Sequence, residues 1–149
     1  MKTVIILLLT SALLLLPGCM DFTPAIQASE RAIAQFHQQY NKMQFDEIHD
    51  GAHYQYQRAS TKSEHNRLLT DVHQNLGLVV STQNTGHGVI STTDLGTFIA
   101  FRQETTFQYG NAIEEFVFYF NEPITLLSGY HFTITSITPP SAVIQSSIH

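Results

Sequence analysis

The side chains best suited to chemistry in this sequence are its eight histidines and six tyrosines. His49 and His53 stand four residues apart, which would place two imidazoles on one face of a helix, with Asp46 and Asp50 nearby. A zinc site also needs a third ligand at suitable spacing, and a metalloprotease motif needs a glutamate between its histidines. Neither is present here, so we predict structural or surface histidines, no metal and no cofactor.

A second group of side chains could line a ligand pocket between helices and sheet. Its members are Tyr40, His53, Tyr54, Tyr56 and Tyr130. Together with an acid, tyrosine and histidine can handle an enolate, as in isomerases and dehydratases. The alternative is that they are ordinary core and rim aromatics, because analogy between folds is a poor guide to activity. An inward carboxylate on a strand would favour the pocket. Glu104 and Glu114 are the nearest candidates, and we expect both to face outward or lie near a turn.

Other catalytic patterns are missing. No serine stands in a G-x-S-x-G setting, so a hydrolase nucleophile is not predicted. Gly86-His87-Gly88 lacks the lysine and the helix that follow a phosphate-binding loop, and we predict a hairpin turn there. His65 and His73 are eight residues apart in a helical segment, where we expect them to face solvent.

Two amphipathic helices are predicted in the first half of the chain. Thr23-Pro24 is typical of a helix start, and apolar residues at helical spacing extend the first helix over residues 24–42. Thr61 and Glu64 have the spacing of a capping box, which places the other helix at 62–76, with an apolar stripe that includes Leu68, and Gly77 as its end. Residues 45–48 form a short helical piece between them. The stretch from His53 to Tyr56 has no clear assignment.

After residue 77 the hydrophobic period changes to two, which predicts strands near 78–83, 97–108, 112–120 and 124–134. Residues 112–120 carry phenylalanines on one face and Val117 and Tyr119 on the other, so we expect a central strand buried on both sides. In the last strand, Ile124 and Leu126 are expected to share a face with Tyr130. Helices followed by hairpin-linked strands predict an α+β fold, with the helices packed on a four-stranded antiparallel meander in a cone-like arrangement.

A modest apolar patch is expected on the sheet. Phe98 and Ala100 share the polar-looking side of their strand. If helices do not cover that side, the patch is available to a protein partner, to the tail at 139–149 or to a second copy of the chain. Pairing of open sheet edges into a homodimer is a further alternative.

The charge balance excludes several partners. The formal net charge is −5, and only 13% of the residues are charged. Nucleic acid requires a basic footprint, and so does docking on anionic lipid through a basic patch. The length suits one domain, which we place at residues 24–138, with a loose tail at 139–149.

The first residues have the three parts of an export signal. Lys2 supplies a positive charge, and the apolar run from Val4 to Leu16 is broken only by Thr10 and Ser11. A helix needs about 20 apolar residues to span a bilayer, whereas a signal-peptide core needs about 7–15. We therefore predict a cleaved signal peptide at residues 1–18.

The residues Leu16-Pro17-Gly18-Cys19 resemble the bacterial lipobox. This resemblance implies cleavage between Gly18 and Cys19 and acylation of Cys19, the only cysteine in the chain. Residues 19–23 would then be a short lipidated tether that holds the domain close to the membrane. By resemblance to enterobacterial lipoproteins, Met20 implies sorting to the periplasmic face of the outer membrane.

The domain itself resembles small bacterial lipoproteins of unassigned function with a cystatin-like or nuclear-transport-factor-like fold. The segments that carry this resemblance are 36–41, 45–48, 68–77, 114–118 and 127–130. It implies the order of helices and strands but supplies no catalytic residues. We therefore favour a lipid-anchored, non-catalytic binding or accessory module. A protein with a small apolar ligand pocket and isomerase-type chemistry is the alternative.

Overall fold

Helices come first in the chain and strands follow. The computed structural model describes residues 21–92 and 95–138. Its elements are α1 (Thr23–Asn41), α2 (Phe45–Asp50), α3 (Tyr54–Ala59), α4 (Lys62–Leu76), β1 (Val79–Thr92), β2 (Gly96–Phe107), β3 (Gly110–Asn121) and β4 (Ile124–Ile137). The predicted signal peptide, Cys19 with its lipid, and the tail at 139–149 lie outside the described residues.

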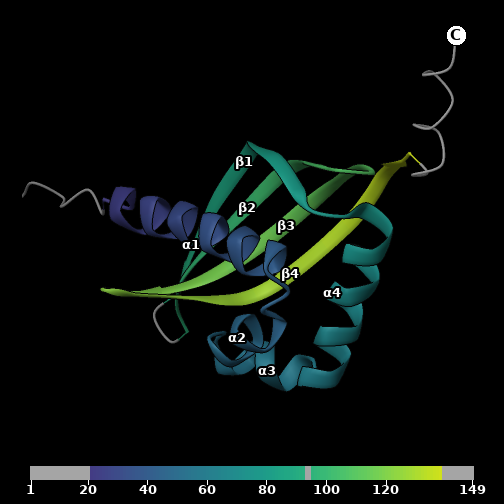
Figure 1. The fold of residues 1–149 in the computed structure, drawn as a ribbon. Coiled ribbons are helices and arrows are strands. Elements are labelled where there is room, and N and C mark those ends of the chain that lie inside the picture. Colours follow the sequence, from purple (N-terminus) through teal and green to yellow (C-terminus); the bar gives the residue numbers. More distant parts are fainter. Residues whose placement is uncertain (1–20, 93–94, 139–149) are drawn as a thin grey trace, which may run out of the picture.

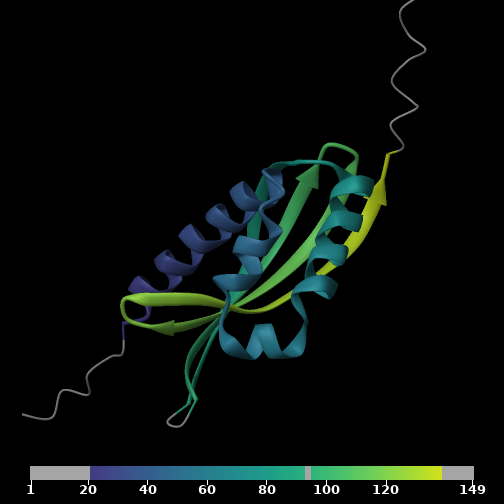
Figure 2. The ribbon, with the colours of Figure 1, turned by 60° about the horizontal axis from the view of Figure 1, so that its bottom comes forward.

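The strands form one open antiparallel sheet in the order β1-β2-β3-β4, which confirms the predicted α+β class and meander. The helices gather on one side of this sheet, with α1 crossing it and α4 standing at the other end of the layer (Figure 1). The second view shows the same two-layer arrangement (Figure 2). We call the helix-covered face of the sheet the inner face and the opposite one the outer face.

Helix boundaries follow local signals. In α4 the Thr61 side chain accepts from the backbone N–H of Glu64, and the Glu64 carboxylate accepts from the backbone N–H of Thr61, so the predicted capping box is confirmed. Gly77 ends α4 with a φ of 75°, a conformation that glycine adopts without strain. The first helix begins one residue earlier than predicted, because Asp21 rather than Thr23 accepts the free N–H at its start.

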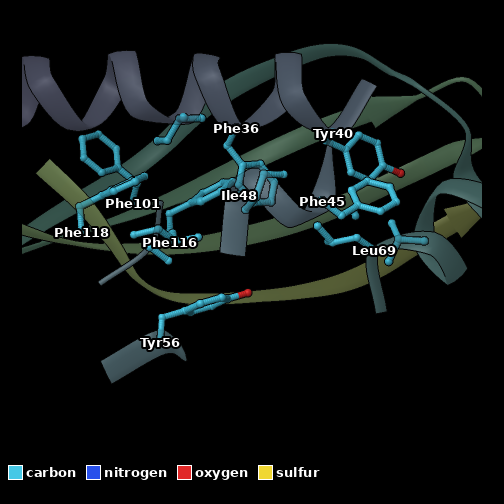
Figure 3. Packing of buried hydrophobic residues seen from close by; sticks show 14 of the residues in the cluster. Phe36, Tyr40, Phe45, Ile48, Tyr56, Leu69, Phe101, Phe116 and Phe118 are labelled. Carbon is cyan, nitrogen blue, oxygen red and sulfur yellow. The ribbon is translucent and has the colours of Figure 1, made fainter. Parts of the chain in front are cut away.

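The core fills the space between α1, α4 and the inner face. Aromatic side chains from both layers pack together there, as Figure 3 shows for Phe36 of α1 beside Phe116 of β3, and for Tyr40 of α1 beside Phe45 of α2. The Phe36 and Phe116 rings meet edge to face, with centroids 5.1 Å apart. Along β2 and β3, successive side chains point to opposite faces of the sheet. Every second residue therefore faces the core, as a period of two predicts.

Two strand predictions were wrong. Gly86-His87-Gly88 is not a turn: β1 runs through it to Thr92, with Gly86 opposite Arg102 and Gly88 opposite Ala100. The hydrogen-bonded ladder with β2 overrides the local turn preference of the glycines. The outer face of β3 is only half-buried, because all the helices pack on the inner face.

A register shift in β4 changes which side chains face inward. Leu127 pairs with Phe118 and Gly129 with Val117, so Ser128 is an extra residue, a β-bulge. The bulge brings Leu127 and Tyr130 onto the same inner face although they are three residues apart. The expected alignment of Ile124 and Leu126 with Tyr130 was therefore wrong.

Two predictions on α4 were also wrong. His65 is fully buried rather than solvent-facing, whereas Leu68 is exposed. The reason lies in the unassigned stretch of the sequence, which forms α3 and packs beside the start of α4. The Tyr56 hydroxyl of α3 donates to Nδ1 of His65 at 2.8 Å, so a polar contact occupies the inward position.

Candidate functional site

The most unusual group in the core is the carboxylate of Glu114, which is 1% exposed on the inner face of β3. Three side chains hydrogen-bond to it. His37 Nε2 lies 2.8 Å from Oε2, Thr105 donates to the same oxygen, and the Tyr130 hydroxyl donates to Oε1 at 2.7 Å. The prediction that Glu114 faces outward or lies near a turn was wrong.

Each partner comes from a different element. α1 supplies His37, one residue after the core aromatic Phe36, and β2 supplies Thr105 from the strand beside β3. Tyr130 reaches the cluster because the bulge at Ser128 turns it inward. Sequence reasoning missed this cluster, although Glu114 is in phase with Ala112, Phe116 and Phe118 and the period of two places it on the buried face.

The surroundings of Glu114 favour its ionised form. Burial by itself raises the pKa of this carboxyl, but the hydrogen bonds from His37, Thr105 and Tyr130 outweigh it and the net pKa is lowered. Burial and the nearby carboxylate raise the pKa of Tyr130 well above its usual value, so its hydroxyl remains a donor. An acid–base catalyst has to reach a substrate. Here both carboxylate oxygens are already hydrogen-bonded within the chain.

The predicted pocket residues are distributed over several places. Tyr130 belongs to the Glu114 cluster, whereas the Tyr40 hydroxyl donates to the carbonyl of Gly77 at 3.0 Å. Tyr56 binds His65, as described above. His53 packs between Tyr54 and Tyr119, with ring centroids 4.4 and 4.6 Å away, and Tyr54 is 58% exposed.

The histidine pair is also separated. His49 lies in α2, where its Nε2 donates to the carbonyl of Ser60 at 2.9 Å, whereas His53 follows that helix and precedes α3. Gly51 ends α2 between them, so they do not share a helical face. Within residues 21–92 and 95–138, no group of three potential ligands is arranged to hold a metal ion.

A small cleft opens on the inner side between α1, α2 and the start of β4. It has a volume of about 110 Å³ and includes Phe36, Ile48, Phe118 and Thr125 in its lining. The space is enough for about three or four water molecules at ~30 Å³ each, and is smaller than a typical pocket for an organic ligand.

The outer face carries a larger depression of about 280 Å³, which we call the outer groove. The strand register explains it, because one row of paired residues across the sheet consists of small side chains. That row is Gly88, Ala100, Val117 and Gly129. The row on one side holds Ile90, Phe98, Tyr119 and Leu126. The row on the other side holds Gly86, Arg102, Glu115 and His131.

The groove is lined on this face by Gly86, Gly88, Ala100, Val117, Arg102 and Glu115. It thus has a charged wall on one side, and the apolar row borders it on the other side without lining it. Phe98 and Tyr119 meet edge to face in this neighbouring apolar row, with ring centroids 5.5 Å apart. Arg102 Nη1 lies 2.6 Å from Oε1 of Glu115 in the charged wall, and both side chains are about half exposed. The predicted apolar patch at Phe98 and Ala100 lies on this face, which no helix among the described residues covers.

Gly86 follows a register shift between Asn84 and Gly86 in the β1–β2 ladder, whereas Gly88 lies in regular pairing. A Cβ at Gly86 or Gly88 would meet no atom within 4 Å, and neither residue has a positive φ. Glycine inside a strand weakens it and often marks a place where another backbone or a ligand approaches closely. The floor of the groove is therefore open to solvent at Gly86 and Gly88.

Two searches add context to this geometry. Comparison with protein-family models and with curated protein sequences found no match to the chain. The resemblance to small lipoproteins of unassigned function therefore stays a prediction from its motifs. Across the described part of the chain, no helix has the length and apolar character needed to cross a bilayer.

Proposed function

We propose that this protein is a lipid-anchored, non-catalytic module of the bacterial cell envelope that binds a protein partner in the outer groove. The observation that carries the proposal is the groove itself, which no described helix covers, with its small-residue floor and the apolar row beside it. A floor of glycine and alanine lets a partner's main chain approach closely, while Phe98 and Tyr119 offer aromatic area for its side chains.

The anchor is proposed from the sequence. The apolar run ends in Leu16-Pro17-Gly18-Cys19, and acylation of Cys19 accounts for the single cysteine. Such a module would act at the membrane surface, and Met20 favours the outer membrane of an enterobacterial-type envelope. A tether of a few residues leaves the groove close to other envelope proteins.

The alternative of acid–base chemistry has one supporting observation, the inward carboxylate of Glu114. Its three donors come from three different elements, so the arrangement ties α1, β2 and β4 to β3. A buried, hydrogen-bonded carboxylate of this kind specifies packing and requires no substrate. Binding through the outer groove is therefore the function that the geometry supports better.

Site-specific photo-crosslinking in intact cells tests the proposal. A crosslinking amino acid at Val117, on the groove floor, should give a discrete adduct with one envelope protein. The same label at Thr106, exposed on the same face three rows away, should not. Adding Ala100→Arg, which places a long charged side chain in the groove, should abolish the Val117 adduct without lowering the melting temperature. Equal adducts from both positions, or none from Val117, would contradict groove binding.

A further inference from the structure

One end of the molecule brings together the start of α1 and the turns of both outer hairpins. The start of α1, the β3–β4 turn and the β1–β2 turn lie toward the same end in both views, and β4 runs from there toward the far end of the sheet (Figures 1 and 2). Asp21, the first described residue, precedes α1 at this end. We call it the tether end.

Large apolar side chains are exposed at the tether end. Ile124, the first residue of β4, is 50% exposed, Leu95 in the β1–β2 turn is 61% exposed, and Ile90 near the end of β1 is 59% exposed. Hairpin turns are usually made of small and polar residues, so a leucine at position 95 is unusual. The exposure of Leu95 and Ile124 leaves apolar surface in water at the tips of the two hairpins.

Exposure alone does not select this end, because Ile137 at the far end of β4 is 56% exposed. The tether makes the distinction. Only three residues separate Cys19 from Thr23, the first residue of α1, and the four residue-to-residue steps between them span at most about 14 Å. Ile137 is 13 residues further along β4 than Ile124, which is about 43 Å in an extended strand. An acyl group on Cys19 therefore holds the tether end at the bilayer surface and leaves the end that carries Ile137 far from it.

We propose that the tether end docks on the lipid bilayer, with Leu95 and Ile124 in the interfacial layer beside the acylated Cys19. This inference depends on the proposed function, because it requires lipid on Cys19. Apolar side chains bury about 5–10 Å into the boundary between headgroups and acyl chains. Docking at several points fixes the orientation of the domain, so that the outer groove opens along the membrane instead of rotating freely about the tether.

The charges at this end favour a neutral lipid surface. Asp21 precedes α1 and Glu122 lies in the β3–β4 turn, and both are exposed acids. Anionic lipid would repel them, so apolar burial rather than charge attraction has to drive docking. We therefore expect docking on vesicles of zwitterionic phosphatidylcholine, with little dependence on salt.

Single-tryptophan reporters test this inference, because the sequence contains no tryptophan. The full chain is expressed, purified from membranes as the processed protein and placed in phosphatidylcholine vesicles with and without brominated acyl chains. In the Ile124→Trp variant we expect a blue shift of the emission and its loss on bromination. In the matched control, Ile137→Trp, we expect emission typical of water and no quenching. Leu95→Trp replaces the first reporter if Ile124→Trp does not fold, as judged by circular dichroism.

The mass of the purified chain separates two kinds of failure. If Cys19 is acylated and both reporters are quenched equally, or neither is quenched, the docking inference is overturned while the anchor stands. If the mass shows no lipid on Cys19, the anchor and the docking inference fail together. Quenching at position 124 and not at 137, on an acylated chain, supports both.

Discussion

At the scale of single residues, the Glu114 carboxylate of β3 connects the helix layer to the sheet and two neighbouring strands to its own. Its oxygens accept hydrogen bonds from residues of α1, β2 and β4, although burial alone opposes its charge. Removing such an acceptor leaves several buried donors without a partner, which is more costly than the net gain of any one hydrogen bond.

We expect Glu114→Gln to lower the free energy of unfolding by about 2–4 kcal/mol. The amide keeps the shape but places an N–H₂ group where a donor already points. Glu115→Gln is the matched control, since it changes the next residue, which faces outward in an exposed ion pair with Arg102. That change should cost less than about 1 kcal/mol. Urea denaturation of both variants measures the difference, and equal effects would show that the Glu114 cluster does not stabilise the fold.

At the scale of elements, the buried side chain of His65 connects α4 to α3 and to α2. Its Nδ1 accepts from Tyr56 of α3, so Nε2 carries the proton and donates to the carbonyl of Phe45 in α2 at 3.1 Å. Burial, followed by the nearby His49, lowers the pKa of His65 to about 4. The neutral ring is therefore part of the packing of α2, α3 and α4.

This arrangement predicts a dependence of stability on pH. The unfolded chain binds a proton at His65 near pH 6.5, whereas the folded chain binds it only near pH 4. The stabilisation is thus complete above pH 6.5 and is lost as the pH falls toward 4, by at most about 3 kcal/mol. Unfolding free energies of wild type and His65→Gln, measured by urea at several pH values, should converge as the pH falls through this window.

The control for this measurement is His131→Gln, which removes an exposed histidine from β4. Its stability should differ from wild type by a nearly constant amount between pH 4 and 7. If the difference in unfolding free energy between wild type and His65→Gln stays the same at all these pH values, His65 does not cause the pH dependence.

At the scale of the whole molecule, the two faces of the sheet have different roles. The inner face is closed by helices and tied by the Glu114 cluster, whereas the outer face remains open and carries the groove. The proposed anchor at Cys19 and the apolar tether end would place this open face beside the membrane. Partner binding would then depend on the anchor as well as on the groove.

Processing at Cys19 is the prediction that belongs to this scale. We expect mass spectrometry of the membrane-purified protein to show a chain that begins at Cys19 and carries acyl groups. An inhibitor of signal peptidase II, or the variant Cys19→Ser, should cause the full-length chain to accumulate. A mature chain that begins elsewhere, or processing that survives Cys19→Ser, would refute the lipoprotein assignment.

Much of the fold follows from sequence signals that act over a few residues. The capping box at Thr61 and the glycine at 77 bound α4 because they satisfy or release backbone groups locally. The period of two in β2 and β3 follows from strand geometry, and the open apolar patch at Phe98 and Ala100 could be inferred from the same alternation.

Tertiary structure decided the features that depend on pairing between distant segments. The bulge at Ser128 sets the inward side of β4, and pairing with β2 keeps Gly86 and Gly88 in a strand. The row of small residues that forms the outer groove exists only once four strands are in register. Glu114 and His37, 77 residues apart, meet because α1 packs on β3, and no local pattern encodes that contact. The sequence by itself determined the order of helices before strands and the motif for the proposed anchor, because both depend on local patterns. Long-range packing decided the length of β1, which side chains meet and which face the described helices leave open.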